Sequence, residues 1–334
     1  MNPYQLSNRR YTGSKAQLLE WIAELVLEHT AGNSFLDLFA GTGVVAEEAS
    51  RHFSQIIVND FLPSNYASYQ GFFGKGRYSA KKIDKKIFEY NLIDATLLGD
   101  NYFSTSYGDK FFSMENARKI GRIRDLIEAE KEEFTKREYW ILLCSLMYSA
   151  DKVANTVGHY DAFFSKQSNR GVFMMKPIAA HVNSGYKIYH KDANLLAKTV
   201  QADVVYIDPP YNSRQYSRFY HVLDNLITWE KPELFGVARK PEPTNMSEYS
   251  KTGAKHAFKD LIENLNCKYI VVSYNNTFNP KSSSSKNKIT FDELLEILNA
   301  KGDTITESKS HKHFNAGSTK FDDHREYLFI TKVR

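Results

Sequence analysis

Cysteine is scarce in this chain, with two residues in 334. Cys144 and Cys267 lie far apart in apolar surroundings, so the sequence offers neither a disulfide framework nor the ligand spacing of a zinc site. It therefore predicts a protein of a reducing, cytosolic compartment. His159, His181, His190 and His221 have no i, i+4 partner or carboxylate pattern that resembles a metal site, so no metal ion is expected.

Long apolar runs are also missing. The longest, "YWILLCSLMYSA" at residues 139–150, is too short to cross a membrane, and the N-terminal "MNPYQLSNRR" lacks the apolar core of a signal peptide. We therefore expect a soluble, cytoplasmic protein that is not exported and has no membrane partner.

A strong excess of charge of either sign is absent. The formal net charge is +5 and the pI is about 8.8, which permits a polyanionic partner without requiring one. With 42% hydrophobic and 25% charged residues, the chain fits one large or two modest globular domains. No internal repeat of fixed period is present.

What is present is an interrupted alternation of strands and helices, which predicts an α/β fold. A helix at 14–30, a strand at 34–39, a glycine loop, a second helix and a strand ending at residue 60 come first. From 61 to 190 the pattern becomes largely helical, and after 191 the alternation resumes. We interpret 1–60 and 191–334 as one domain and 61–190 as an inserted subdomain. The low-complexity stretch "PKSSSSKNK" at residues 280–288 indicates a basic loop.

The glycine loop, Phe39-Ala40-Gly41-Thr42-Gly43, lies between a strand and a helix, and Asp60 follows Gly41 by 19 positions. This spacing suits an adenosine-containing cofactor, because backbone can approach the ligand and the acid can bind ribose hydroxyls. The missing third glycine argues against a nicotinamide or flavin cofactor. Alternatively, the loop is only a turn that prefers glycine. Lys15, in "RRYTGSK", suits a cofactor carboxylate, or else is a solvated residue of a helix start.

The stretch "ADVVYIDPPYNSRQY" places Asp208 directly after a buried β-branched run, which Pro209 and Pro210 must end. Asp208 is therefore expected at the carboxyl end of a strand, the edge at which open α/β sheets bind ligands. The alternative is a turn with no chemical role.

Taken in order, "RYTGSK", "DLFAGTG", the acid of "VND" and "DPPY" resemble the S-adenosylmethionine-dependent N6-adenine DNA methyltransferases of the α-class, or Dam type. The stretch "DPPYNSRQYSRFYHVLDNL" is similar to the methyltransferases of FokI-type restriction-modification systems. The resemblance implies the Rossmann-like mixed sheet of class I methyltransferases, with 61–190 as a target-recognition subdomain. It also implies S-adenosylmethionine as cofactor, double-stranded DNA as substrate and a cognate restriction endonuclease as partner.

The same resemblance assigns the site. Asp60 binds the ribose of the cofactor, Asp192 its adenine amino group, and the "RYTGSK" segment its methionine part. The implied cofactor-binding residues are Tyr11, Thr12, Lys15, Asp37, Phe39, Ala40, Gly41, Gly43, Asp60 and Asp192. The implied catalytic residues are Asp208, Pro209, Pro210 and Tyr211.

The chemistry of adenine explains why an aspartate suits the catalytic position. The N6 lone pair is delocalised into the ring, so an acceptor must draw on the N6 hydrogens as the nitrogen becomes tetrahedral. Asp208 and the carbonyl of Pro209 can each accept one hydrogen, and Tyr211 offers a face on which an extruded base can stack.

Residues 165–191 are rich in Lys and Arg, contain no acid before residue 192, and carry interleaved aromatic residues, which suits phosphate contacts. A solvated loop would explain the charges equally well. The predicted DNA-binding residues are Lys166, Arg170, Lys176, Asn212, Arg214 and Tyr216. A noncatalytic nucleic-acid-binding protein and an RNA or protein methyltransferase remain alternatives at this stage, and a nicotinamide dehydrogenase is a more distant one.

Overall fold

The computed structural model describes residues 2–166, 170–182, 185–277, 286–310 and 324–334. It divides the chain into two compact units. The sheet unit comprises Gly13–Phe61, Lys187–Tyr216 and Asn245–Arg334, and the helical unit comprises Met1–Thr12, Leu62–Tyr186 and Ser217–Thr244. Residues 280–285 of the predicted basic loop lie outside the described residues.

This division differs from the predicted one at four places. Phe61 and residues 187–190, which the sequence assigned to the inserted subdomain, belong to the sheet unit. Residues 1–12 and 217–244, which the sequence assigned to the catalytic domain, pack within the helical unit. The first segment is held there by long-range contacts: Tyr4 bridges to Ile178, and the Arg9 guanidinium donates to the Asn65 side chain at 2.7 Å. Such contacts join positions far apart in the chain and leave no periodic signal in the sequence.

The sheet unit contains a seven-stranded sheet with the order β3-β2-β1-β4-β5-β7-β6. The strands are β1 (Ser34–Asp37), β2 (Gln55–Asn59), β3 (Lys187–Tyr189), β4 (Val204–Ile207), β5 (Tyr269–Asn275), β6 (Gly302–Ser310) and β7 (Arg325–Val333). Strands β1 to β5 are parallel, whereas β7 runs antiparallel to both β5 and β6. The order 3-2-1-4-5 is that of a doubly wound Rossmann sheet, so the predicted α/β fold with a Rossmann-like mixed sheet is confirmed.

The sequence did not predict β6. Only Gly302 of this strand is buried, Thr304 and Ser308 are half-buried, and the other positions are exposed, so the strand has no apolar run. β6 lies at the edge of the sheet and is held by its backbone pairing with β7. Backbone hydrogen bonds leave no pattern of apolar residues, so the sequence did not indicate this strand.

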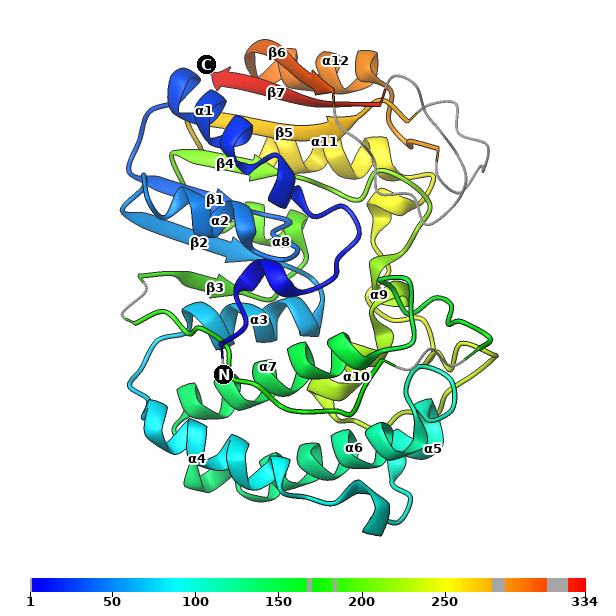
Figure 1. Ribbon diagram of the computed structural model, residues 1–334. Helices are drawn as coiled ribbons and strands as arrows, with labels where there is room; N and C mark the ends of the chain where they lie inside the picture. The colour runs from blue at the N-terminus through cyan, green and yellow to red at the C-terminus, as the bar shows by residue number, and fades with distance from the viewer. Residues whose placement is uncertain (1, 167–169, 183–184, 278–285, 311–323) are drawn as a thin grey trace. The chain divides into compact units, whose positions relative to one another are not determined.

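Helices cover both faces of the sheet (Figure 1). On one face lie α1 (Leu19–His29), preceded by a 3₁₀ turn at Lys15–Gln17, and α2 (Val44–Ala49). On the other lie α8 (Ala193–Ala197), α11 (Ala254–Asn264) and α12 (Phe291–Lys301), whose apolar side chains form one cluster with those of the central strands. A further 3₁₀ turn spans Glu248–Ser250, and the short helix α9 spans Tyr216–Phe219.

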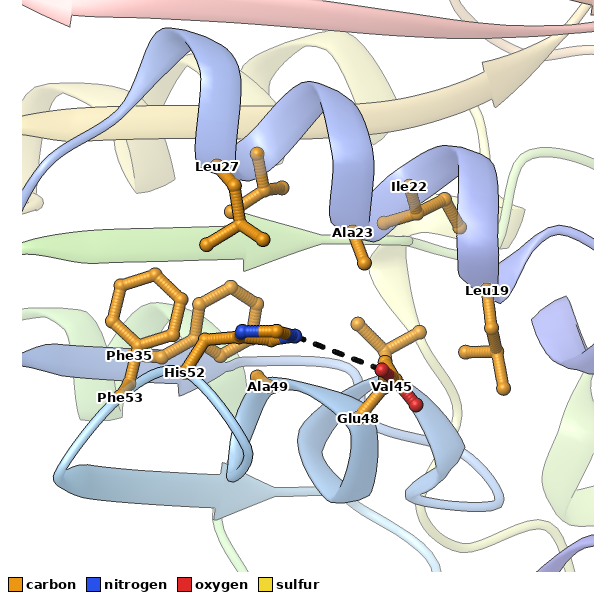
Figure 2. Close-up of a pocket in the computed structure, with 11 residues that line it drawn as sticks. Leu19, Ile22, Ala23, Leu27, Phe35, Val45, Glu48, Ala49, His52 and Phe53 are labelled. Carbon is orange, nitrogen blue, oxygen red and sulfur yellow. Dashed lines mark ion pairs between the residues drawn. The ribbon is translucent and has the colours of Figure 1, made fainter.

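An apolar pocket lies between α1 and α2 (Figure 2). Leu19, Ala23 and Leu27 face it from α1, and an ion pair between Glu48 and His52, with Nε2 and Oε1 3.7 Å apart, lies at its edge. None of the site residues predicted from the sequence lines this pocket.

The helical unit is built around α7 (Lys136–Val153), which contacts α3 (Pro63–Phe73), α4 (Ala80–Asn91), α6 (Met114–Ala129) and α10 (His221–Thr228). A capping box between Thr135 and Glu138 starts α7, and most of its side chains are buried. The largely helical character predicted for residues 61–190 is confirmed. The unit also contains α5 (Tyr102–Tyr107) and 3₁₀ turns at Leu6–Asn8, Ala95–Leu97 and Lys131–Glu133.

Over the described residues, no helix combines the length and the apolarity needed to cross a membrane. Over the same ranges, no cluster of three or more His, Cys, Asp or Glu side chains has a geometry that could hold a metal ion.

Candidate functional site

Three carboxylates lie at the carboxyl ends of neighbouring parallel strands. Asp37 is the last residue of β1, Asp60 directly follows β2, and Asp208 directly follows β4. Asp37 pairs in register with Tyr206 of β4, so the ends of these strands meet at one edge of the sheet. The order of the strands reverses between β1 and β4, which makes this edge the topological switch point where such sheets bind ligands.

The glycine loop joins β1 to α2 at the same edge. Gly41 and Gly43 have φ angles of +54° and +84°, in the left-handed region that favours glycine. The N–H of Gly41 donates to Oδ2 of Asp60 at 2.8 Å, and the N–H of Ala40 donates to the carbonyl of Asn59 at 2.9 Å. The structure therefore brings the loop and the predicted ribose-binding acid into direct contact. Phe39 packs edge-to-face on Tyr249.

Asp37 is buried, with 1% of its surface exposed. Neither of its carboxylate oxygens has a hydrogen-bond partner of normal geometry among the described residues. Burial raises the pKa of Asp37 well above its ordinary value, the charges of Asp208 and Asp60 add to the effect, and the N–H of Ala46 opposes it. A buried carboxylate in this state is costly without a donor or a cation, so the position suits contact with a ligand.

Asp208 forms a buried ion pair with Lys15, whose Nζ lies 2.7 Å from Oδ2 of Asp208 and 3.5 Å from Oε1 of Glu326. Burial would lower the pKa of Lys15, but the two carboxylates raise it well above its ordinary value. Lys15 is only 6% exposed, so the interpretation of this lysine as a solvated residue is wrong. The sequence did not anticipate its contact with Asp208.

The environment also changes the basicity of Asp208. Burial raises its pKa to about 6, and Glu326 adds to the increase while Lys15 opposes it. An acid with a pKa of about 6 is ionised near neutral pH and is a stronger hydrogen-bond acceptor than an ordinary carboxylate. Asp208 is therefore equipped to accept a hydrogen from a bound substrate.

Tyr211 is half-buried and packs edge-to-face on Tyr274, with ring centroids 5.8 Å apart. Its carbonyl accepts the N–H of Lys288 at 2.8 Å, and burial raises the pKa of its hydroxyl to about 12. The ring is therefore neutral and held from both its backbone and one edge. Pro209 is buried and Pro210 is half-buried behind it.

Asp192 follows β3 and caps α8, accepting the N–H of Leu195 at 3.1 Å. Asn59, at the end of β2, donates to the carbonyl of Lys191 at 3.0 Å and accepts its N–H at 3.0 Å. This double contact fixes Asp192 beside the end of β2. Sequence reasoning missed Asn59, although its place before Asp60 in "VND" could have indicated it.

Residues 11–279 match the model of the D12 class N6 adenine-specific DNA methyltransferases. The chain belongs to this family. It is 35% identical over 289 residues to modification methylase StsI of Streptococcus sanguinis, covering 80% of this chain and 44% of StsI. It is 29% identical to type II methyltransferase M.NlaIII of Neisseria lactamica, covering 96% of this chain and 98% of that protein.

Type II methyltransferase M.FokI of Planomicrobium okeanokoites is 30% identical over 314 residues, covering 88% of this chain and 47% of M.FokI. The chain thus spans less than half of StsI and M.FokI but nearly all of M.NlaIII. The resemblance to N6-adenine DNA methyltransferases, including those of the FokI type, is confirmed.

In this D12-class chain, Tyr11 and Thr12 belong to the helical unit. The Tyr11 ring stacks on Tyr220 with centroids 4.7 Å apart, and the Arg9 guanidinium lies over both rings. The N–H of Thr12 donates to the Tyr220 hydroxyl at 2.8 Å. Both predicted residues are therefore fixed by one aromatic pair.

Three of the predicted DNA-binding residues also belong to the helical unit. Lys166 and Arg170 are exposed, and the Arg170 guanidinium lies 5.8 Å from the centroid of Phe164, whereas Lys176 is half-buried. The Arg170 guanidinium also donates to the Thr156 carbonyl at 3.4 Å. Exposed cations such as these two suit contacts with phosphate groups.

The other three follow Tyr211 in the sheet unit and are all half-buried. The Asn212 side chain accepts the N–H of Arg214 at 3.0 Å, and the Arg214 carbonyl accepts the Ser250 hydroxyl at 3.1 Å. The Tyr216 hydroxyl lies 3.0 Å from where a Cβ would stand on Gly13, whose φ is +81°. Asn212 and Arg214 thus shape the loop, and Gly13 leaves room for Tyr216.

Sequence reasoning also missed Glu326 and Ser273, which lie behind the ion pair on β7 and β5. The Ser273 hydroxyl donates to Oε1 of Glu326 at 2.6 Å, and both residues are buried. An acid inside the apolar strand "REYLFITKV" is the signal that could have drawn attention to this position.

Proposed function

We propose that this chain is a site-specific DNA methyltransferase that transfers a methyl group from S-adenosylmethionine to N6 of an adenine turned out of double-stranded DNA. The observation that carries the proposal is the half-buried Asp208, ion-paired with Lys15 at the switch point of the sheet, beside the glycine loop, in a chain of the D12 class. We further propose that it acts in the cytoplasm, within a restriction-modification system whose endonuclease recognises the same DNA sequence.

The residues at the switch point fit S-adenosylmethionine. Asp60, already bonded to the glycine loop, would hold the ribose hydroxyls, and Asp192 the adenine amino group. Asp37, whose carboxyl oxygens have no hydrogen-bond partner of normal geometry among the described residues, fits a ligand that brings a positive charge or an N–H donor. The remaining residues proposed for the cofactor are Tyr11, Thr12, Lys15, Phe39, Ala40, Gly41 and Gly43.

When bound, S-adenosylmethionine supplies an electrophilic methyl group on a sulfonium. Asp208 accepts one N6 hydrogen and the Pro209 carbonyl accepts the other, so that the nitrogen lone pair turns toward the methyl carbon. Transfer of this methyl group would leave a surplus proton on N6, and Asp208 would take it up. Tyr211 provides the face on which the extruded base stacks. Pro210 fixes the turn between Pro209 and Tyr211.

We propose that the helical unit contains the target-recognition surface. The exposed Lys166 and Arg170 and the half-buried Lys176 would contact phosphate groups, and Asn212, Arg214 and Tyr216 would contact the flipped nucleotide or its phosphates. Residues 61–190, most of which lie in this unit, would select the DNA sequence.

The proposed function is tested by incubating the full chain with mixed-sequence DNA and S-adenosylmethionine, followed by methylation-sensitive sequencing. We expect N6-methyladenine at one defined sequence. Methyl groups on cytosine N4 would overturn the choice of base, and transfer to RNA alone would favour an RNA methyltransferase. If DNA is bound without any transfer, the chain is a noncatalytic nucleic-acid-binding protein.

Asp60→Ala is expected to weaken binding of S-adenosylmethionine by about 1.5 to 3 kcal/mol, the range for hydrogen bonds to a charged group. Asp60→Asn should weaken it less, because the amide oxygen can still accept the N–H of Gly41. Calorimetric titration measures both affinities, with the exposed Asp303→Asn as control. An unchanged affinity in Asp60→Ala would remove Asp60 from the ribose site.

Reversing the charges of Lys166 and Arg170 is expected to weaken DNA binding and to flatten its dependence on salt, because fewer counterions are released on binding. Affinity is measured by fluorescence anisotropy across a salt series. The same charge change at the exposed Lys259 of α11 and Lys332 of β7, which lie outside residues 61–190, is the control. Equal effects of the two double variants would mean that net charge, and not this basic stretch, governs binding.

A further inference from the structure

Glu326 and Asp208 share one ammonium group. Lys15 Nζ lies between Oδ2 of Asp208 at 2.7 Å and Oε1 of Glu326 at 3.5 Å. The side chains of Lys15 and Glu326 are 7% and 5% exposed. Over the described ranges, neither carboxylate forms an ion pair with any other Lys or Arg.

The position of Glu326 is fixed by the sheet. It pairs in register with Asn275 of β5, and the Ser273 hydroxyl donates to Oε1, the same oxygen that faces Lys15. The strand pairing holds the backbone of Glu326, and the Ser273 hydroxyl holds the oxygen that faces Lys15. The carboxylate is therefore kept beside the ammonium group. The place of this carboxylate relative to Lys15 is therefore set by β5 and β7.

We propose that Glu326 is a positioning residue that holds part of the Lys15 charge away from Asp208 and so keeps Asp208 a strong acceptor for the N6 hydrogens of adenine. The inference rests on the proposed function. Asp208 remains the group that touches the substrate, whereas Glu326 acts through Lys15.

The physical reason is the opposition of two effects. An ammonium group at contact distance favours the ionised carboxylate and commonly lowers a carboxyl pKa by about 1–3 units, which makes it a weaker acceptor. A second carboxylate near the same ammonium acts in the opposite direction. The other ionisable groups whose charges act on this site are Asp37 of β1, Tyr206 of β4 and Tyr211 of the following loop. Apart from Asp208 itself, Glu326 is the carboxylate that forms an ion pair with Lys15 among the described residues.

The decisive variant is Glu326→Gln, which keeps an oxygen for the Ser273 hydroxyl and removes only the charge. Selective ¹³C labelling of Asp carboxyl groups, with Asp208→Asn to assign the signal, gives the pKa of Asp208 in the full chain without DNA or cofactor. We expect the pKa to fall by about one unit in Glu326→Gln. The exposed Glu307→Gln, on β6, is the matched control and should leave it unchanged.

Methyl transfer provides the second measurement. Because Asp208 must be ionised to accept a hydrogen, kcat should rise with pH through about 6 in the wild type. In Glu326→Gln this rise of kcat should occur at lower pH. The value of kcat that is reached above the rise should be smaller than in the wild type, with little change in KM for DNA. A purely structural role would lower the amount of folded protein without moving the pH profile.

The proposal would be overturned if the pKa of Asp208 were the same in the wild type and in Glu326→Gln, or if it were higher in the variant. So would a lowered pKa with an unmoved kcat profile. If Glu326→Gln fails to fold, Glu326→Asp keeps the charge but withdraws it, and the Asp208 pKa should still fall. A wild type that transfers no methyl group would refute the proposed function, while the titration would still decide whether Glu326 controls Asp208.

Discussion

Asp208→Asn will lower the rate of methyl transfer by about 10²- to 10³-fold, the cost of removing a positioned electrostatic group from a reaction centre. The affinity for S-adenosylmethionine should change little, because Asp208 acts on the target amine and the cofactor is held by other residues. Asparagine keeps the size of the side chain but replaces a charged, half-buried acceptor that is paired with the buried Lys15. Transfer is measured with radiolabelled cofactor on DNA and affinity by calorimetry.

The exposed Asp303→Asn serves as control for this experiment and should keep full activity. Loss of cofactor binding together with activity would contradict the assignment of Asp208 to the target amine. Retention of the full rate would show that the aspartate only ends the strand, the alternative that the sequence left open.

Lys15→Met is expected to destabilise the fold by about 3–5 kcal/mol, the cost of breaking a buried ion pair by removing one partner. Asp208 and Glu326 would then face each other without the ammonium group that lies between them. The loss should be largest at neutral pH and smaller toward pH 5. Uptake of a proton by either carboxylate relieves the repulsion, and the pKa of Asp208, already about 6, should rise further without Lys15.

Urea unfolding of Lys15→Met at several pH values measures this effect. Adding Glu326→Gln should recover part of the stability, because one of the two stranded charges is removed. The exposed Lys259→Met on α11 is the control and should unfold like the wild type. A neutral effect of Lys15→Met at pH 7, or no recovery in the double variant, would mean that the ion pair contributes nothing to the fold.

The positions of Asp60 and Asp208 could be predicted because local patterns decide them. Each follows a run of buried β-branched or apolar residues, which is typical of strands that are covered on both faces of a parallel sheet. The glycine loop is equally local, since Gly41 and Gly43 adopt φ angles that most other residues avoid. Motif order along the chain was therefore sufficient for the family, which the match over residues 11–279 confirms.

The contact of Lys15 with Asp208 joins positions 193 residues apart, and Glu326 approaches the pair from a third segment. These contacts exist because β7 pairs antiparallel with β5, next to β4, an arrangement that no local pattern specifies. For the same reason, residues 1–12 and 217–244 could not be assigned to the helical unit from their sequence.

The sequence by itself determined the strand ends, the glycine turn and the residues placed there, because steric and hydrophobic preferences act between near neighbours. Only the tertiary structure decided the charge environment of Asp208. Electrostatic effects depend on burial and on distances in space, which exist only once the sheet is assembled. Burial then raises the pKa of Asp208 to about 6, Lys15 opposes this increase, and Glu326 on β7 adds to it.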